Sequence, residues 1–431
     1  MLKKRLLAAL TAFAMLSATG CDAAKEKKAE EERYQPATVQ YGDENCIEIE
    51  KMLLEHLTND GALDESKLAD VTELRFAGLG AVSVVCGETG GTDMSEGFYE
   101  PVVDTYFEDR LFVVDDYYDG VILSMYLYGE VRNISDLPCV DDLSFIEYMP
   151  RLECLEVPVN FIDDISPLSN CTELKMLNLC CSDKLEDISP LKSCTQLQEL
   201  RIASSKVSDI SALAELKELR ALNLSYTEVD DLTALHELEL LDTLAVMGCK
   251  KSVLKDVAGI KPLKYLDISE ADFKDISVFN GLEKLETIIA YDTSISELSS
   301  EKPDLPALKN LVITNHNWSG KLKDISQISE LKSLETVFLI GNEIEDISAL
   351  EGLKSLKVLS LDANEAITDI SALSSLTSLE KLRLGCTMVK DVTPLMGLEN
   401  IKEIFLRLCE ELAESDVQAL REALPDCEIL F

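Results

Sequence analysis

The stretch Asp209 to Thr227, D-I-S-A-L-A-E-L-K-E-L-R-A-L-N-L-S-Y-T, carries the pattern that decides the fold. Its opening motif, Asp-Ile-Ser-x-Leu, recurs along the chain and is followed by Leu-x-x-Leu-x-Leu. The copies at Asp164, Asp187 and Asp209 are 23 and 22 residues apart, and two further clear copies begin at Asp346 and Asp369. Self-similarity at this period indicates a solenoid, because each unit buries its apolar face only against its neighbours.

Each unit is predicted to contain one short strand. In Leu219-x-x-Leu222-x-Leu224 the side chains alternate across the strand, so Leu222 and Leu224 point inward. The same alternation turns the intervening residues outward, namely Ala221, Asn223 and Ser225. Strands of neighbouring units then pair in parallel and form one continuous sheet.

The segment between the motif and the strand is predicted to be a helical turn on the opposite wall. A Ser or Thr is expected at its N-cap, followed in three copies by proline at the first helical position: Ser166-Pro167, Ser189-Pro190 and Thr393-Pro394. The recurrent aspartate just before it is well placed to accept turn amides. We therefore interpret these aspartates as structural rather than as calcium ligands.

This pattern resembles that of bacterial leucine-rich repeat proteins, and the 22-residue Asp-Ile-Ser-Pro-Leu form is similar to the internalin-like subclass. The resemblance covers about residues 133–409. It implies an α/β fold: a curved, right-handed leucine-rich repeat solenoid with a parallel sheet on the concave face, short helical or 3-10 turns on the convex face, and helical caps at both ends. It also implies a role in binding a protein or a glycan on the sheet.

The flanks of the repeat array are predicted to be caps. Residues 43–132 form the N-terminal cap, with a helix in Glu48 to Leu57 and a first strand in Leu68-x-x-Val71-x-x-Leu74-x-Phe76. Residues 78–121 within it are acidic, rich in tyrosine and unlike any repeat, so we expect an irregular insertion there, and a partner contact is an open alternative. Residues 410–431 form the C-terminal cap, with an amphipathic helix in Asp416 to Pro425.

The N-terminus is predicted to be an export signal. Residues 1–20 combine a basic start, Lys3-Lys4-Arg5, with an apolar run from Leu6 to Ala18 that is too short to span a bilayer. Cys21 follows in a sequence that resembles a lipobox, which implies acylation at Cys21 and a lipid-anchored, charged linker over residues 21–42. A simple secretory signal is the alternative. Either way we expect an extracytoplasmic protein, lipid-anchored to the bacterial membrane or cell surface.

Composition and motifs exclude several function classes. Asp and Glu number 80 against 40 Lys and Arg, a formal net charge of −40, which disfavours nucleic acid and anionic polymers as partners. The three histidines, His56, His236 and His316, lie far apart in the sequence, and no catalytic or nucleotide-binding motif occurs. We therefore predict that the protein is not an enzyme and has no cofactor and no metal site.

The 13 cysteines are mostly interpreted as structural thiols. Cys171 and Cys194 occupy the same slot in adjacent repeats. Cys249 and Cys409 fall at the turn after the strand, where leucine-rich repeats use Asn or Cys. Cys46 with Cys86 is the pair in which a disulfide would be tested.

The repeat spacing slips in the middle of the array. Asp231 to Asp256 is 25 residues, Asp256 to Asp275 is 19, and Glu297 to Asp324 is 27. One excursion holds Trp318, the single tryptophan of the chain. An exposed Trp318 would be a candidate hot spot for binding; alternatively, it folds back over the irregular turn.

The outward strand positions are the candidate partner-binding surface. They are aromatic and aliphatic in the middle of the array and locally basic towards the C-terminus. We expect an exposed patch, although neighbouring polar side chains that cover it, or simple β-propensity, are alternatives. The candidate residues, together with Trp318 on its loop, are Tyr226, Tyr265, Tyr291, Val312, Trp318, Phe338, Ile340, Lys381, Arg383, Phe405 and Arg407.

Two classes of function fit these observations. The first is a cell-surface lipoprotein that binds a macromolecular partner, most simply a protein, through the concave face of the solenoid. The second is a structural or self-associating envelope component. A glycan-binding accessory lipoprotein is a further alternative, because aromatic side chains on the sheet also suit sugars. The oligomeric state is not predicted.

Overall fold

The computed structural model describes residues 71–77, 81–86, 143–157, 162–315 and 320–431. The chain divides into two compact units, Met1–Cys139 and Val140–Phe431. The predicted signal segment, Cys21, the linker, the helix in residues 48–57 and Trp318 lie outside the described residues. Those predictions remain predictions.

The described part of the first unit is an antiparallel pair of strands. Strand β1 spans Val71–Ala77 and pairs with β2, which spans Ala81–Cys86, with an irregularity in register between Val71 and Glu73. The strand predicted around Leu74 is therefore present. Strand β2 lies inside the range 78–121 that the sequence marked as irregular, so that range starts with regular structure.

The second unit is built on one parallel sheet. Thirteen described strands follow one another in chain order, each hydrogen-bonded to the next. The strands are β3 (Cys154–Glu156), β4 (Met176–Asn178), β5 (Glu199–Arg201), β6 (Ala221–Asn223), β7 (Thr243–Ala245), β8 (Tyr265–Asp267), β9 (Thr287–Tyr291), β10 (Asn310–Thr314), β11 (Thr336–Phe338), β12 (Val358–Ser360), β13 (Lys381–Arg383), β14 (Glu403–Phe405) and β15 (Glu428–Leu430). An inward apolar residue of each strand is in register with its counterpart on the next strand, as Leu200, Leu222 and Leu244 are.

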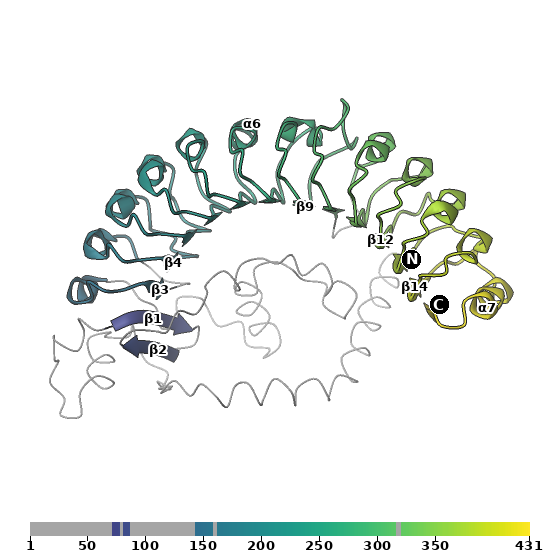
Figure 1. The fold of residues 1–431 in the computed structure, drawn as a ribbon, viewed down its shortest axis with the longest axis horizontal. Helices are drawn as coiled ribbons and strands as arrows, with labels where there is room; N and C mark the ends of the chain where they lie inside the picture. The colour runs from purple at the N-terminus through teal and green to yellow at the C-terminus, as the bar shows by residue number, and fades with distance from the viewer. Residues whose placement is uncertain (1–70, 78–80, 87–142, 158–161, 316–319) are drawn as a thin grey trace. The chain divides into compact units, whose positions relative to one another are not determined.

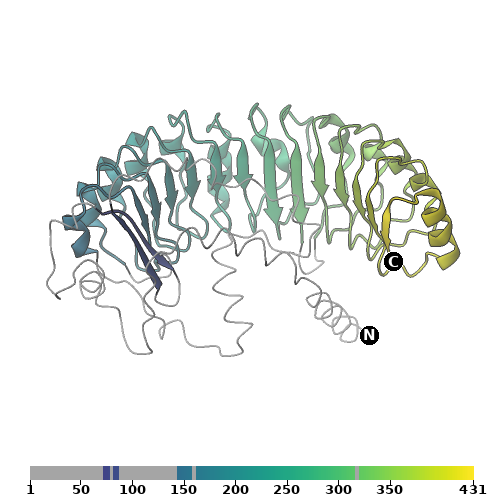
Figure 2. The same cartoon turned by 60° about the horizontal axis from the view of Figure 1, so that its bottom comes forward.

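The second unit is an arc, with the strands along its concave edge and short helices along its convex edge (Figure 1). Figure 2 shows the strands side by side in one layer with the helices behind them. The convex helices are 3-10 turns apart from the single-turn α6 (Leu254–Val257): η4 (Ser144–Tyr148), η5 (Ser166–Asn170), η6 (Ser189–Ser193), η7 (Ser211–Glu215), η8 (Thr233–Leu235), η9 (Lys251–Val253), η10 (Ile276–Phe279), η11 (Ser326–Glu330), η12 (Ser348–Leu350), η13 (Ser371–Ser375) and η14 (Thr393–Leu395). The predicted solenoid architecture is confirmed.

The core lies between the sheet and the convex turns. Leu219 and Leu224 are completely buried, and Leu222 is 2 % exposed. Burying a leucine contributes about 1.5–3 kcal/mol, and each repeat buries several. The cost of ordering the chain is met only when neighbouring repeats stack, because the faces of a single repeat would stay open.

The recurrent aspartate forms the same turn in nine described repeats. Its Oδ1 accepts the backbone N–H of the residue two positions later at 2.8 or 2.9 Å, as Asp209 does from Ser211. The structural interpretation of the aspartates is confirmed. The predicted cap is corrected: the 3-10 turn begins at Ser166, not at Pro167, and Asp164 supplies the acceptor that a Ser side chain was expected to supply.

The turn after several strands is closed by a polar or thiol side chain. Asn364 Nδ2 donates to the carbonyls of Leu339 and Leu361 at 2.8 and 2.9 Å. Cys249 and Cys409 take the same slot, with their Sγ atoms 3.1 Å from the carbonyl oxygens of Leu224 and Leu384. These cysteines are structural, as predicted.

The described cysteines are free thiols. Cys171 and Cys194 are buried in equivalent slots, and burial raises the pKa of Cys171 to about 12 and that of Cys194 to about 11. Such thiols are inert at neutral pH, because the reactive thiolate is not formed. Cys46 lies outside the described residues, so the Cys46–Cys86 pair remains a prediction.

The C-terminal end is closed by a helix and one more strand. Helix α7 spans Glu414–Ala423 and buries Val417 and Leu420, so the predicted cap helix is present. The chain then returns as β15 and pairs with β14, which extends the sheet into the predicted cap. Arg421 Nη2 donates to the carbonyl oxygen of Ile429 at 3.3 Å and ties the helix to this last strand. Among the described residues, no helix is long and apolar enough to cross a membrane.

Candidate partner-binding face

Each strand places two side chains on the concave face, and a third lies just after the strand. The first column contains Cys154, Met176, Glu199, Ala221, Thr243, Tyr265, Thr287, Asn310, Thr336, Val358, Lys381 and Glu403. The second column, two residues later, contains Glu156, Asn178, Arg201, Asn223, Ala245, Asp267, Ile289, Val312, Phe338, Ser360, Arg383 and Phe405. The third column, two residues later again, includes Ser225, Met247, Ser269, Tyr291, Thr314, Ile340, Asp362, Gly385 and Arg407.

The candidate residues fall on these columns as their spacing predicts. Tyr265 and Lys381 lie in the first column. Val312, Phe338, Arg383 and Phe405 lie in the second column, and Tyr291, Ile340 and Arg407 lie in the third. Tyr226 is on the turn that follows β6. The shared face is therefore correct for the other described candidates, whereas Tyr226, expected among the outward strand positions, lies on the turn instead.

The exposure expected for the middle of this face is wrong. The exposed fractions of Tyr265, Tyr291, Val312 and Phe338 are 6, 5, 3 and 0 %. One cause is the register, because Val312 stands directly between Ile289 and Phe338 on adjacent strands, where cross-strand side chains pack on one another. A charged substitution at Phe338 would therefore destabilise the fold, so a loss of binding in that variant would not show that Phe338 contacts a partner. Contact of these four residues with a partner stays a prediction.

The C-terminal part of the face holds a cluster of five residues, which we call the Arg–Phe cluster: Asp362, Arg383, Gly385, Phe405 and Arg407. Arg383 Nε donates to Asp362 Oδ2 at 2.6 Å, and the N–H of Gly385 donates to Asp362 Oδ1 at 2.6 Å. The Arg383 guanidinium carbon lies 4.0 Å from the centre of the Phe405 ring, and that of Arg407 lies 5.8 Å from it. Two cations thus lie within cation–π range of one ring.

The Phe405 ring packs against Gly385, which leaves room for it because it has no side chain. A Cβ atom at position 385 would lie 2.6 Å from Phe405 Cε1 and 3.1 Å from Asp362 Oδ1. Any side chain there would displace the ring or the carboxylate. The small residue therefore lets the ring of β14 lie across the end of β13.

Carboxylates balance part of the positive charge near the cluster. Burial raises the pKa of Asp362, and the Arg383 guanidinium opposes that rise. Burial also raises the pKa of Glu403, against the opposing effect of Lys381 and Arg383. Arg383 and Lys381 therefore have acidic neighbours. Arg407 forms no ion pair with any residue that the structure describes.

The residue that follows the third column adopts a left-handed backbone. Its φ lies between 50° and 69° at Cys181, Ser204, Tyr226, Gly248, Glu270, Asp292, Gly341, Ala363, Cys386 and Leu408. Leu408, which sequence reasoning missed, is 66 % exposed. The sequence did offer a hint that this position is a turn: two repeats have glycine at the equivalent position, and glycine is the residue best suited to a left-handed backbone.

Besides Leu408, Tyr226 is an exposed large side chain in this turn column, at 42 % exposure. Its ring lies over Gly248, where an added Cβ would come within 2.5 Å of Tyr226 Cδ1. Its hydroxyl donates to Glu270 Oε1 at 2.5 Å, two repeats away. Tyr226 is therefore at the surface as predicted, and it is held along the lateral edge of the solenoid.

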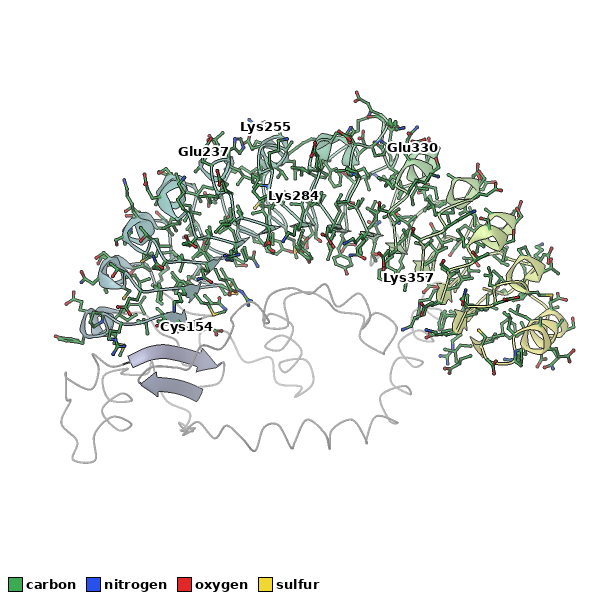
Figure 3. The ribbon with its side chains drawn as sticks, in the orientation of Figure 1. Cys154, Glu237, Lys255, Lys284, Glu330 and Lys357 are labelled. Atoms are coloured by element: carbon green, nitrogen blue, oxygen red, sulfur yellow. The ribbon has the colours of Figure 1, made fainter. Side chains whose placement is uncertain are left out.

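Sequence reasoning also missed a ladder of charges beside the first column. The residue before each first-column position alternates in sign from Asp242 onward: Asp242, Lys264, Glu286, Lys309, Glu335, Lys357, Glu380 and Lys402. Four ion pairs bridge consecutive members, at 3.0, 2.7, 2.5 and 2.5 Å. Lys357 is labelled in Figure 3. The alternating charges are visible in the sequence, at the second residue of each Leu-x-x-Leu motif. Which charges form ion pairs depends on which repeats are adjacent in the solenoid.

The convex side offers no comparable site. His236 lies at the end of η8, with Nε2 2.9 Å from the carbonyl oxygen of Asp256. Within the described ranges, no group of three or more His, Cys, Asp or Glu side chains is placed to hold a metal ion.

Comparison with known proteins agrees with this geometry. A family model for leucine-rich repeats in two copies matches residues 332–375. An internalin of Listeria monocytogenes, inlF, is 27 % identical with a TM-score of 0.51, and the match covers 72 % of this chain and 86 % of that one. A leucine-rich repeat protein of Leptospira interrogans is 22 % identical with a TM-score of 0.54, over 68 % and 82 % of the two chains. A search of curated proteins gives no match. The chain therefore contains leucine-rich repeats and folds as a leucine-rich repeat solenoid similar to an internalin.

Proposed function

We propose that this chain is an extracytoplasmic, lipid-anchored protein that binds a protein partner through the concave face of its leucine-rich repeat solenoid. The observation that carries the proposal is the contrast within each repeat. Inward leucines and turn aspartates recur from repeat to repeat, whereas the second concave column changes from Glu156 through Ile289 to Phe405. Because the inward and turn residues maintain the fold, the concave side chains can differ from repeat to repeat, and such a surface can be specific for one partner.

Protein is the favoured class of partner because of the side chains at the C-terminal part of this face. Arginine and aromatic residues are enriched at the centres of protein interfaces, and the Arg–Phe cluster combines two arginines with one ring. The formal net charge of −40 disfavours nucleic acid over the molecule as a whole. A sheet of thirteen described strands also offers a length suited to an extended or globular protein surface.

Anchoring is supported by the sequence of the first 42 residues. A basic start and a short apolar run precede Cys21, and a charged stretch poor in large apolar residues follows. Acylation at Cys21 would hold the chain on a membrane, and the charged stretch would separate the solenoid from the lipid surface.

Site-specific photo-crosslinking of the full chain on living cells tests the binding face. A photoreactive residue is introduced at three half-buried concave positions, Thr243, Asn310 and Ile340, and at three exposed positions on the outer rim, Glu237, Lys255 and Glu330 (Figure 3). The two sets sample the same part of the solenoid and differ in the face they report on. Mass spectrometry then identifies each adduct.

We expect adducts with the same foreign protein from the concave set and none from the rim set. Adducts only from the rim, or only between copies of this chain, would contradict the proposal and favour the self-associating envelope component. Glycan-only adducts from the concave set would replace protein by glycan as the partner class.

The anchor has its own test. We expect the wild-type chain to incorporate labelled palmitate and to sediment with membranes, and Cys21→Ser to lose the label and be released. Ala18→Leu, which brings the sequence closer to a lipobox, is the control and should retain both properties. Unlabelled wild-type chain would leave a simple secretory signal as the explanation.

A further inference from the structure

Leu408, on the turn after β14, presents a large apolar side chain at the surface. Its φ is 62°, in a region that costs a residue with a side chain about 1–2 kcal/mol. It is also 66 % exposed, the largest exposed fraction among the large apolar side chains of the described residues. Glycine meets the same backbone requirement at Gly248 and Gly341. Seven other residues with side chains adopt the same turn, so the backbone angle belongs to the repeat, and the exposed apolar side chain is what distinguishes Leu408.

Arg407, the preceding residue, supplies a charge without a paired carboxylate. Most lysines beside the sheet lie within ion pairs, and Arg383 is paired with Asp362. Arg407 has no such pair among the described residues, and its guanidinium carbon is 5.8 Å from the Phe405 ring. A guanidinium donates to carboxylates through a planar fork of N–H groups, and such charge-assisted hydrogen bonds are about twice as strong as neutral ones.

The Phe405 ring is fixed before any partner arrives. Arg383 packs against the ring at 4.0 Å, Asp362 fixes Arg383, and Gly385 leaves the space that the ring occupies. Side chains that are already ordered cost less entropy on binding, which favours this ring as the apolar part of an anchor.

The acidic neighbours limit the kind of anion that fits. Asp362 and Glu403 are both close to Arg383, so a multiply charged group at the cluster would meet repulsion. The net charge of −40 adds repulsion at long range, but at 0.15 M ionic strength interactions fade beyond about 8 Å. A single carboxylate in direct contact therefore fits better than a strongly acidic segment.

From these observations we infer that the Arg–Phe cluster and Leu408 anchor a segment of the partner in which one carboxylate adjoins an apolar side chain. The carboxylate contacts Arg407, and the apolar side chain packs on Leu408 and the edge of Phe405. This inference rests on the proposed protein-binding function and names the chemistry that the C-terminal part of the concave face recognises.

Methyl NMR of the full chain with labelled leucine tests the inference without the natural partner. The probes are three capped peptides, acetyl-Gly-Gly-Leu-Glu-Gly-Gly-amide, the same peptide with Gln for Glu, and the same peptide with Ser for Leu. The Leu408 methyl signals, assigned with Leu408→Ala, are followed at 0.15 M salt. We expect saturable shifts with the Leu-Glu peptide and binding at least about tenfold weaker for the other two.

Arg407→Gln should bind the Leu-Glu and Leu-Gln peptides equally, because the charge contact is gone. Arg220→Gln is the matched control: Arg220 is an exposed arginine without an ion pair among the described residues, and its change should leave the preference intact. An unchanged melting temperature confirms that each variant folds.

Equal binding of the Leu-Glu and Leu-Gln peptides to the wild type, or no shift at Leu408 up to the solubility limit, would overturn the inference. The proposed function fails separately. If concave photo-crosslinks persist while the peptides show no preference, the face binds a protein through other chemistry; if the crosslinks are absent, the function itself is contradicted.

Discussion

The two sides of each repeat differ in how much they vary. On the turn side, one hydrogen bond recurs in nine described repeats, with an aspartate Oδ1 2.8 or 2.9 Å from the backbone N two residues later. On the concave side, the second column holds Asn178, Ile289 and Arg383 at equivalent places. The recurrent side specifies the fold, and the variable side is where recognition can reside.

The concave side is itself divided. In its middle, Phe338 and its neighbours are buried, whereas towards the C-terminus Arg383, Phe405 and Arg407 are half-buried. Outward direction on a strand is therefore not the same as exposure. The middle of the column behaves as part of the packing of the molecule, and the C-terminal part retains access to a ligand.

The largest expected effect comes from charging the middle of the concave column. Phe338→Glu should lower the free energy of unfolding by at least about 3 kcal/mol, since it removes a fully buried ring and buries a carboxylate. Urea unfolding of the full chain measures the change. Phe405→Glu is the comparison, because Phe405 occupies the equivalent strand position but is half-buried. Its free energy of unfolding should fall much less.

Equal losses at the two positions would show that the buried middle and the half-buried end do not differ, and the division of the concave face would then have to be abandoned.

A smaller effect is expected from the turn aspartates in acid. The N–H of Ser211 lowers the pKa of Asp209 below its ordinary 3.8, and Ser166 does the same for Asp164. Because the folded pKa is lower than the unfolded one, this stabilisation is present above pH 3.8 and is lost as the pH falls through the folded value. Asp209→Asn should therefore melt below the wild type at pH 7, and the difference should vanish near pH 2.

Asp183→Asn serves as the control, because Asp183 is an exposed turn aspartate for which no such hydrogen bond is found among the described residues. It should show no difference at either pH. A pH-independent difference for Asp209→Asn would mean that the charge of the carboxylate contributes nothing beyond its shape.

The smallest effect is expected in the charge ladder. Lys357→Glu would place three acidic residues in a row, because Lys357 pairs with Glu335 at 2.5 Å and has Glu380 on its other side. Lys357 is half exposed, so the loss should stay below about 1 kcal/mol at physiological salt. Thermal unfolding at low and high salt measures it, and 1 M salt should remove most of the difference.

Lys357→Gln removes the same ion pair without adding a third acidic residue, so it should lose less stability than Lys357→Glu. A loss that is insensitive to salt and equal in the two variants would have to arise from packing instead of charge.

Much of the fold could be predicted because its determinants repeat. Leu219, Leu222 and Leu224 recur with their spacing, so the sheet, the inward face and the parallel order followed from the sequence. The aspartate turn was predicted for the same reason. The exact start of the 3-10 turns was not, because Ser and Pro are both acceptable in its first positions, and the hydrogen bond from Ser166 to Asp164 decides between them.

The candidate site could be predicted only in part. Spacing placed Arg383, Phe405 and Arg407 on one face, but the burial of Phe338 depends on packing between repeats. The space that Gly385 leaves for the Phe405 ring involves residues of two neighbouring repeats, and Leu408 is distinguished by its exposure. None of these features repeats, so periodicity gave no signal for them.

A substitution scan of residues 379–389 and 401–411 with two readouts tests the central claim most directly. Each variant of the full chain is scored for folding by protease resistance and for capture of the crosslinked partner. We expect substitutions at inward positions such as Leu382 and Ile404 to lose both protease resistance and capture, whereas those at Arg407 and Leu408 lose capture and keep protease resistance. If no outward position loses capture without losing protease resistance, the claim that the variable concave side carries recognition is contradicted.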